Sequence, residues 1–407
     1  MTDSGNVETT SIKIHPPSHP HPLVWIRRNL FNNWLNSILT LLSIATVYFV
    51  GRAVLEWVFI EADWRPVTDN PILYLVGQYP RDQLWRVGAS LLLVSFLTGM
   101  SWGVWRGILR SFAILLAAGY VVMALIPVGG QMGSLAVRGF FLINAPIIIL
   151  GFLLGSRKFI TGMIVLGGWL FSFIAIPILL HGIGDLALLP IVETTLWGGL
   201  MVTIFLAVGG ILLSFPLGVL LALGRRSSLP VIKTFCIAFI EGVRGVPLIT
   251  ILFMSSIILA LFLPPELRID RLVRALIGMA IFSAAYTAEN VRGGLQSVPS
   301  GQIEAAKAVG LNNFQTTLLI VLPQAIRAVI PAIVGQFIAL FKDTTLVIIV
   351  AIIELLNIGK SILQSDVTYL QLQMEVYLFV AAVFWILSFF MSYASRQLET
   401  ALGVGER

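Results

Sequence analysis

The recurrence of long apolar runs between short polar segments constrains the fold of this chain more than any other feature. Of its 407 residues, 57% are hydrophobic and only 11% are charged, whereas a soluble domain carries about 25% charged residues. An apolar run of about 20 residues crosses a bilayer as a helix, which satisfies its own backbone hydrogen bonds. We therefore predict an all-α polytopic membrane protein with about ten transmembrane helices.

The predicted spans form two groups of five. An N-terminal extension covers residues 30–189 and a C-terminal core covers residues 190–400, with tails at 1–29 and 401–407. The ten spans are predicted at residues 30–50, 87–104, 111–128, 139–155, 159–180, 194–223, 232–263, 272–290, 328–355 and 374–394.

Basic residues set the predicted orientation. Arg27 and Arg28 precede the first span, and Arg225 and Arg226 follow the sixth. Because Lys and Arg are enriched on the cytoplasmic side of membrane proteins, we predict that both termini are cytoplasmic. The same asymmetry accounts for the formal net charge of +6. Membrane lipids are therefore the expected surroundings, and the sequence gives no support for nucleic-acid binding.

A polar loop at residues 295–323 interrupts the core. Its pattern is Glu-Ala-Ala, three residues, Gly, nine residues and Ile-x-Leu-Pro, and its fixed positions are Glu304, Ala305, Ala306, Gly310, Ile320, Leu322 and Pro323. Ser300 is placed to cap a short helix with Glu304 in its first turn, and Gly310 suits the left-handed residue that ends such a helix. We predict a helix of about nine residues.

This short helix has the composition of a docking element. Ala305, Ala306 and Val309 form a small apolar face that lets a partner surface approach closely, whereas Gln302 and Glu304 stay in water. Gly301 belongs to the same candidate contact surface. An amphipathic loop helix with a glycine cap and no partner is the alternative.

Charged residues inside the predicted spans are the second signal. One polar string, at residues 241–247, ends the seventh span on its inner side, another, at 285–294, ends the eighth, and a third, at 342–346, interrupts the ninth. Charges at membrane depth usually face a cavity, a partner or a water-filled path. The candidate substrate-pathway residues are Arg244, Pro247, Tyr286, Glu289, Arg292, Lys342, Asp343 and Thr344.

Together these motifs resemble the permeases of ABC importers. The loop pattern matches the coupling loop of that family at every fixed position. Four further strings resemble hallmarks of its polar-amino-acid subfamily, namely Arg-Gly-x-Pro-Leu at 244–248, Ala-Tyr-x-Ala-Glu through Arg-Gly-Gly at 285–294, Pro-Gln-Ala at 323–325 and Lys-Asp-Thr-Thr-Leu at 342–346. In the last string Thr345 replaces the usual serine and keeps its hydroxyl. The resemblance covers about the C-terminal half.

The extra N-terminal spans resemble those of the longer permease of general L-amino-acid importers, in which two unlike permease chains pair. The resemblance implies a permease subunit of the bacterial inner membrane that imports L-amino acids delivered by a periplasmic binding protein. It also implies cytoplasmic ATPase subunits on separate chains, which hold ATP and Mg, docked on the loop at 295–323.

We expect no enzymatic activity and no cofactor on this chain. The string Gly359-Lys360-Ser361 ends like a phosphate-binding loop, but Glu354 stands where its first glycine is needed. The single cysteine, Cys236, excludes an intrachain disulfide and a cysteine-based metal site. His15, His19 and His21 form a tract found both in metal sites and in disordered tails, and we predict a disordered tail.

Two other functions stay open on the sequence alone. An ion-coupled secondary transporter would use Lys342, Asp343, Glu289 and Arg292 to couple to an ion. A membrane-embedded hydrolase would use Ser101, although a nucleophile elbow requires a strand-to-helix turn rather than a membrane helix. For Lys342 and Asp343, a structural ion pair that locks the ninth span to its neighbours is a further alternative.

Overall fold

The computed structural model describes residues 22–125, 135–184, 189–264 and 269–403. Every named element in these ranges is helical, and their two β-bridges are isolated pairs, so the predicted all-α class is confirmed. The chain divides into two units, Met1–Asp63 and Trp64–Arg407, which we describe separately.

The first unit contains two helices and a π-helical turn. Helix α1 spans Pro22–Leu30, α2 spans Trp34–Glu56, and the π-helix η1 spans Trp57–Glu61. Asn33 caps α2, because its side chain accepts hydrogen bonds from two backbone N–H groups of the first turn. Residues 22–29, which we expected in a disordered tail, are therefore helical, while the histidine tract lies outside the described residues.

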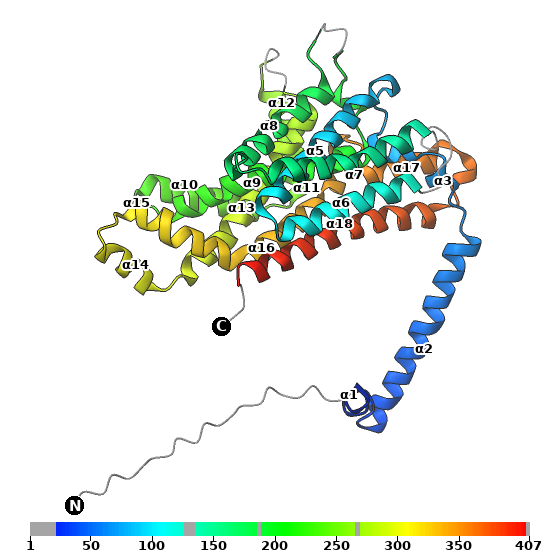
Figure 1. Ribbon diagram of the computed structural model, residues 1–407, viewed down its shortest axis with the longest axis horizontal. Helices are drawn as coiled ribbons and strands as arrows, with labels where there is room; N and C mark the ends of the chain where they lie inside the picture. Colours follow the sequence, from blue (N-terminus) through cyan, green and yellow to red (C-terminus); the bar gives the residue numbers. More distant parts are fainter. Residues whose placement is uncertain (1–21, 126–134, 185–188, 265–268, 404–407) are drawn as a thin grey trace, which may run out of the picture. The chain divides into compact units, whose positions relative to one another are not determined.

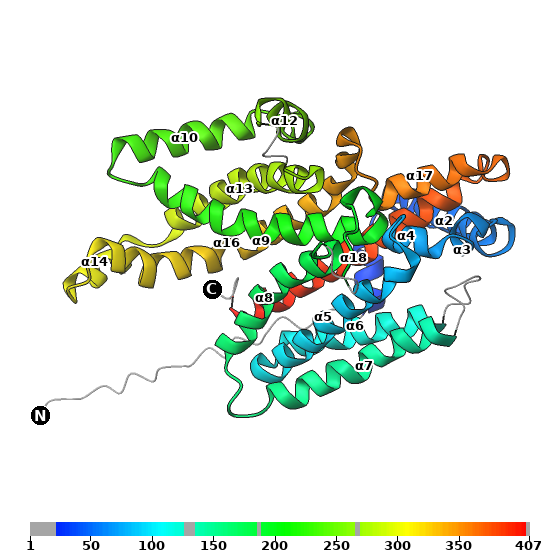
Figure 2. The same ribbon diagram turned by 90° about the horizontal axis from the view of Figure 1, so that it is seen from above.

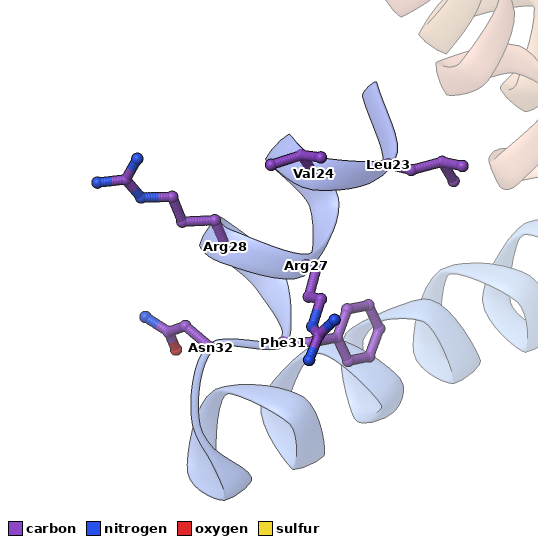
Figure 3. Close-up of a pocket in the computed structure, with 6 residues that line it drawn as sticks. All are labelled: Leu23, Val24, Arg27, Arg28, Phe31 and Asn32. Atoms are coloured by element: carbon purple, nitrogen blue, oxygen red, sulfur yellow. The ribbon is translucent and has the colours of Figure 1, made fainter. Parts of the chain in front are cut away.

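The junction between α1 and α2 is hollowed on one side. Figure 3 shows Arg28 and Asn32 extending to the same side of this junction, away from Leu23. The hollow has a volume of about 580 Å³. All of the apolar side chains that α2 carries lie outside the protein core, as suits a helix that spans a membrane.

In the second unit, the extension is a bundle of four long helices preceded by short ones. Its elements are α3 (Arg65–Thr68), α4 (Pro71–Val76), η2 (Arg81–Gln83), α5 (Leu84–Trp105), α6 (Ile108–Leu125), α7 (Leu135–Gly155) and α8 (Gly162–His181). Gly99 on α5 faces α7 so closely that a Cβ there would lie 2.0 Å from the Ile148 carbonyl oxygen. Small residues thus bring these two helices into backbone contact.

The core follows as a second set of helices, with α9 and α13 packed against each other at its centre (Figure 2). Its elements are η4 (Thr194–Leu196), α9 (Gly199–Arg225), α10 (Pro230–Arg244), α11 (Leu248–Phe253), η5 (Met254–Ile258), α12 (Leu259–Phe262), α13 (Arg271–Ser297), α14 (Ser300–Ala308), α15 (Asn313–Gln315), η6 (Thr316–Val321), α16 (Leu322–Asp343), η7 (Thr344–Val350), α17 (Leu355–Ser365), η8 (Val367–Tyr369) and α18 (Gln373–Ala401). Fully buried alanines on α13, such as Ala284 and Ala288, allow the close approach.

The helices agree with the predicted number of spans. Among the described residues, eight helices are long and apolar enough to cross a membrane, one bent pair qualifies as a broken span, and Leu109–Leu125 is a shorter apolar helix. With the bent pair counted as one span this gives nine, and the shorter helix Leu109–Leu125 lies where the third span is predicted.

The predicted seventh span is not one continuous helix. It consists of Pro230–Arg244 and Leu248–Phe262, bent by 107° at the break between them. Pro247 explains the break, because proline lacks the N–H that would continue the helix and disfavours helical backbone at the preceding residue.

The predicted ninth span also differs from the structure. Its helical run begins within the predicted loop and covers Asn313–Val350, 38 residues, because Pro323 stands in the first turn of α16, where proline is tolerated. Lys342 lies in the last turn of α16, and the helical run continues beyond it through η7 to Val350. The left-handed backbone of Ala351 ends the run, and α17 is an additional helix.

Extension and core meet along a seam at the end of the unit that holds α4 and α17, opposite α14 (Figures 1 and 2). A Cβ on Gly77 would lie 2.6 Å from the Gly198 Cα. Beside this contact, within the core, the backbone N–H of Gly199 donates to the Ile353 carbonyl at 3.1 Å. The close contact between Gly77 and Gly198 joins the two halves, and the predicted domain boundary at residues 189 and 190 stays a prediction.

Candidate functional site

Helix α14 of the predicted coupling loop has the expected length of nine residues, Ser300–Ala308. Its start differs from our prediction. Pro299 occupies the capping position, no side chain caps the helix, and no acidic residue stands in its first turn. Ser300 is therefore the first helical residue instead of the cap, and Glu304 stands one residue further into the helix than expected. The extended backbone of Pro299 sets this start.

The end of α14 agrees with the prediction. Gly310 has a φ of +87°, which only glycine adopts readily. Its N–H donates to the Lys307 carbonyl at 3.0 Å, and the Leu311 N–H donates to the Ala306 carbonyl at 3.1 Å. These two hydrogen bonds close the helix as a left-handed C-terminal cap does.

A second helix starts two residues after this turn. The Asn312 side chain accepts from the Gln315 N–H, and the Gln315 side chain accepts from the Asn312 N–H, which forms a capping box. The loop is therefore a helix-turn-helix that protrudes at one end of the unit (Figure 1).

The predicted apolar face of α14 is divided between two environments. Ala306 is buried in the protein, 5% exposed, whereas Val309 is 78% exposed and Phe314 on α15 is 73% exposed. Ala305 and Glu304 are also exposed. A partner can therefore contact Ala305, Val309 and Phe314 but not Ala306, which packs toward η6.

The rest of the loop motif attaches the helix-turn-helix to the core. Leu322 is buried and packs with Leu295 in one cluster, Ile320 is half-buried, and Pro323 is exposed. Gln324 donates to the Ile320 carbonyl at 2.9 Å and to the Gln302 side chain at 3.5 Å. Gly301 has no atom within 4 Å of the position its Cβ would take, so it stays open to a partner.

Five charged side chains from three helices meet in what we call the inner charge cluster. It consists of Arg225 at the end of α9, Glu241 and Arg244 on α10, and Glu289 and Arg292 on α13. Arg225 contacts Glu241 at 2.8 Å and Glu289 at 3.5 Å. Arg244 contacts Glu289 at 3.6 Å and Glu241 at 3.8 Å.

Glu289 is the centre of this cluster. It accepts hydrogen bonds from Arg292, whose Nε lies 2.9 Å from one carboxylate oxygen, and it faces two further arginines. With three arginines and two glutamates, the cluster carries one excess positive charge. The Arg244 guanidinium also lies over the Tyr286 ring, 5.6 Å from its centroid, in a cation–π contact.

The structure thus brings together four of the eight predicted pathway residues: Arg244, Tyr286, Glu289 and Arg292. Sequence analysis missed Arg225, which it assigned only to a loop, and gave Glu241 no role. The signal was available in the pattern, since both are charged residues at the predicted inner ends of neighbouring spans.

The other four predicted residues lie elsewhere. Pro247 precedes α11, and Thr344 is fully buried in η7, where its hydroxyl donates to the Phe341 carbonyl at 2.7 Å. Lys342 is exposed and Asp343 is half-buried. Neither forms an ion pair with any residue that the structure describes, so the predicted pair with a neighbouring span is not seen there.

Two further sequence patterns have structural roles. Ser101 is buried, donates to the Leu97 carbonyl at 2.8 Å and accepts from Trp169 Nε1 at 2.9 Å, as expected of a serine bonded within its own helix. Glu354 is fully buried and caps α17 by accepting from the Leu356 and Asn357 N–H groups. The Gly359-Lys360-Ser361 string therefore lies inside a helix instead of in a phosphate-binding loop.

Within the described ranges, no group of three or more His, Cys, Asp or Glu side chains is placed to hold a metal ion. What the site offers chemically is a protruding loop for docking and a network of charges between spans.

Known proteins are similar in sequence to this chain over most of its length. Residues 214–404 match the family described as binding-protein-dependent transport system inner membrane component. The chain is 36% identical over 413 aligned positions to the inner membrane amino-acid ABC transporter permease protein YhdY of Escherichia coli (strain K12), covering 96% of this chain and 97% of that protein.

A second relative and a solved structure are also similar to this chain. The glutamate/glutamine/aspartate/asparagine transport system permease protein BztC of Rhodobacter capsulatus is 34% identical over 440 aligned positions, with 99% of each chain covered. A crystal structure of an amino acid ABC transporter with histidines matches 50% of this chain and 92% of its own at 29% identity, with a TM-score of 0.45. Because the first two relatives match over almost their full lengths, extension included, this chain belongs to the multi-pass inner-membrane permeases of binding-protein-dependent ABC importers.

Proposed function

We propose that this chain imports L-amino acids as one of two unlike permease subunits, with a periplasmic binding protein on one side and ATPase subunits on the other. The names of YhdY and BztC, which refer to amino-acid transport, support this substrate class. ATP and Mg belong to the ATPase chains, and this chain holds no cofactor. Both of its termini are cytoplasmic, and lipids surround its spans.

The observation that carries the proposal is the helix-turn-helix of residues 300–321. Its tip exposes two large apolar side chains, Val309 and Phe314, beside the small Ala305. Such exposed apolar groups on a polar, protruding loop are typical of a protein interface. We assign this tip to the ATPase, which would move the spans by moving the loop.

The inner charge cluster supports a gate on the same side. Its five charges join α9, α10 and α13 at their inner ends, so the spans cannot separate there without breaking several ion pairs. Its excess positive charge suits the carboxylate that every amino acid carries. Asp343, half-buried and without an ion pair in the described ranges, stays a candidate pathway residue, and altered substrate preference in Asp343→Asn would support that assignment.

The test is co-purification and uptake with Val309→Asp and Phe314→Asp. We expect both to reduce ATPase retention and ATP-dependent uptake at least tenfold, because each places a charge in an apolar contact. The matched control is Val231→Asp, since Val231 is 81% exposed but lies on α10. Normal ATPase retention in both loop variants would contradict the docking assignment. Uptake that follows an ion gradient instead of ATP would contradict the importer function.

A further inference from the structure

Arg86 is a buried cation without a counter-ion among the residues that the structure describes. Its side chain is fully buried, and all three guanidinium nitrogens lack a hydrogen-bond partner. The Trp85 ring centroid lies 5.9 Å from the guanidinium carbon, and Tyr79 is a second aromatic neighbour. A buried charge is strongly unfavourable unless it is paired and hydrogen-bonded, so this environment requires a compensating group.

The guanidinium lies toward the N-terminal end of α5. Arg86 is the third residue of this helix, and helical side chains lean toward the N-terminus. Tyr79, which precedes the helix, confirms the placement. Burial raises the pKa of its hydroxyl, and the Arg86 guanidinium is close enough to oppose that change. The same hydroxyl donates to the Leu180 carbonyl at 2.7 Å, in the last turn of α8.

Further donors surround the same position. Helix α5 is 22 residues long and no side chain caps its N-terminus. The N–H of its first residue, Leu84, donates to the Arg81 carbonyl of the preceding turn, so the N–H groups that follow and the helix dipole favour an anion. Trp197 Nε1 is also buried without a partner, and the Trp197 ring lies 6.4 Å from that of Tyr79. The acceptors nearby are few: Gln83 Oε1, buried and unpaired, and Asp82, whose carboxylate accepts from the Gln83 amide.

The enclosure limits what can bind. Arg86 is 0% exposed, Tyr79 is 1% exposed and Trp197 is 4% exposed. A lipid headgroup, a peptide or an amino acid could not reach the guanidinium without opening this packing. An ion small enough to be enclosed as the chain folds has no such restriction.

We propose that Arg86 and the N-terminus of α5 bind a small inorganic anion of the halide class. The anion is enclosed by α5, the last turn of α8 and the residues around Tyr79 and Trp197. Because α5 and α8 belong to the extension and Trp197 to the core, the bound anion stabilises the seam between the two halves. This site is independent of substrate transport and of the ATPase.

The experiment measures the thermal unfolding midpoint of the purified complete transporter. Sodium chloride or bromide is compared with sodium gluconate, whose anion is too large to be enclosed, at constant ionic strength. We expect halide to raise the midpoint saturably by about 5 °C. Arg86→Met, which keeps the length and apolar contacts of the side chain, is expected to abolish this rise. Arg81→Met is the matched control, because Arg81 lies five residues earlier and is exposed, and it should keep the rise.

Equal wild-type midpoints in halide and gluconate would overturn the proposal, and would indicate that Asp82 or Gln83 compensates Arg86 instead. An unchanged halide effect in Arg86→Met would overturn it as well. If Arg86→Met does not fold, crystals grown from wild-type transporter that was produced and purified in bromide decide the question by anomalous scattering. A bromide peak within hydrogen-bond distance of the guanidinium supports the site, and no peak there excludes it.

Discussion

Glu289 balances three arginines, so its charge matters more than that of an ordinary surface glutamate. Its side chain is 24% exposed, and Glu289→Gln would leave Arg225, Arg244 and Arg292 with Glu241 alone. We expect this variant to lower the free energy of unfolding by about 1 to 3 kcal/mol. We also expect ATP hydrolysis without substrate to rise, because the inner ends of the spans are then held less firmly.

Denaturant or thermal unfolding of the purified complex, together with its basal ATPase rate, measures both effects. Glu56→Gln is the control, because Glu56 forms an exposed pair with Arg52 at 2.8 Å and such pairs contribute about 0.5 kcal/mol or less. If the two variants were equally stable, Glu289 would not be the centre of the network.

Glu354 gives a prediction about pH. Burial raises the pKa of its carboxyl above the ordinary 4.5, although hydrogen bonds from the Leu356 and Asn357 N–H groups oppose this. Between those two pKa values the folded protein holds a proton that the unfolded chain has lost. The free energy of unfolding therefore decreases as pH rises through this window. We expect Glu354→Gln to remove that decrease.

The thermal midpoints of wild type and Glu354→Gln are measured from pH 4.5 to about pH 7. The difference between the two curves is the contribution of Glu354. Asp366→Asn is the opposite case. Hydrogen bonds from the Thr368 N–H and hydroxyl lower the Asp366 pKa from 3.8, so its contribution is lost only as pH falls through that lower value. Asp366→Asn should therefore leave the dependence of the thermal midpoint on pH unchanged above pH 4.5. Parallel curves for wild type and Glu354→Gln would contradict the buried-carboxyl prediction.

At the scale of single elements, α14 and its turn depend on two glycines in opposite ways. Gly301 lies inside the helix with open space around it, whereas Gly310 holds a φ of +87°. We expect Gly301→Ala to stabilise the loop by about 0.5 to 1 kcal/mol, because alanine favours helix. Gly310→Ala should destabilise it by about 1 kcal/mol, because alanine disfavours left-handed backbone.

Hydrogen exchange of the loop amides measures both changes in the purified permease, and ATPase retention shows their effect on docking. Each substitution adds one methyl group, so each serves as the control for the other. Equal exchange rates in the two variants would mean that the turn at Gly310 does not hold the loop in place.

Local sequence signals predicted much of this loop and less of its surroundings. Gly310 and the length of α14 were predictable, because a left-handed cap requires a glycine. The start of α14 was predicted wrongly. The extended backbone of Pro299 puts this residue in the capping position, so Ser300 is already helical. The burial of Ala306 depends on η6, which the sequence showed only as part of a loop.

The broken seventh span shows a different limit. Pro247 was visible in the sequence, but hydropathy summed over a window does not register a change of helix direction. In the same way, α4 and α17 are too short for a span signal. They become ordered because Tyr74 and Ile358 pack in one cluster, and such long-range contacts are not encoded in local periodicity.

For the whole molecule, the testable property is which end faces the cytoplasm. The Tyr369 hydroxyl lies 3.2 Å from the Asp69 carboxylate, so the segments around Asp69 and Ser365 share one end. In a Cys236→Ser background, we expect cysteines at Asp69 and Ser365 to react with an impermeant thiol reagent in intact cells. A cysteine at Gln302 should react only after permeabilisation.

The two outer cysteines serve as controls for each other, because a shared end requires that they behave alike. Labelling at Gln302 in intact cells, with protection at Asp69, would reverse the proposed orientation. The orientation predicted from charge asymmetry and the docking of the loop on the ATPase would then both be wrong, because both place the loop at 295–323 in the cytoplasm.

The helical run at Asn313–Val350 has a mechanical consequence. Its central α-helix, α16, has 22 residues and forms a strut about 33 Å long at 1.5 Å per residue. Gln324, inside the run, donates to the Gln302 side chain on α14 at 3.5 Å. Three residues beyond the other end, the Ile353 carbonyl accepts a hydrogen bond from Gly199 beside the seam. A helix of fixed length does not shorten when a force acts along its axis. A displacement of the loop along this axis would either bend the chain at the π-helical η6 or move the seam. Packing of the extension against the core at the seam resists that movement.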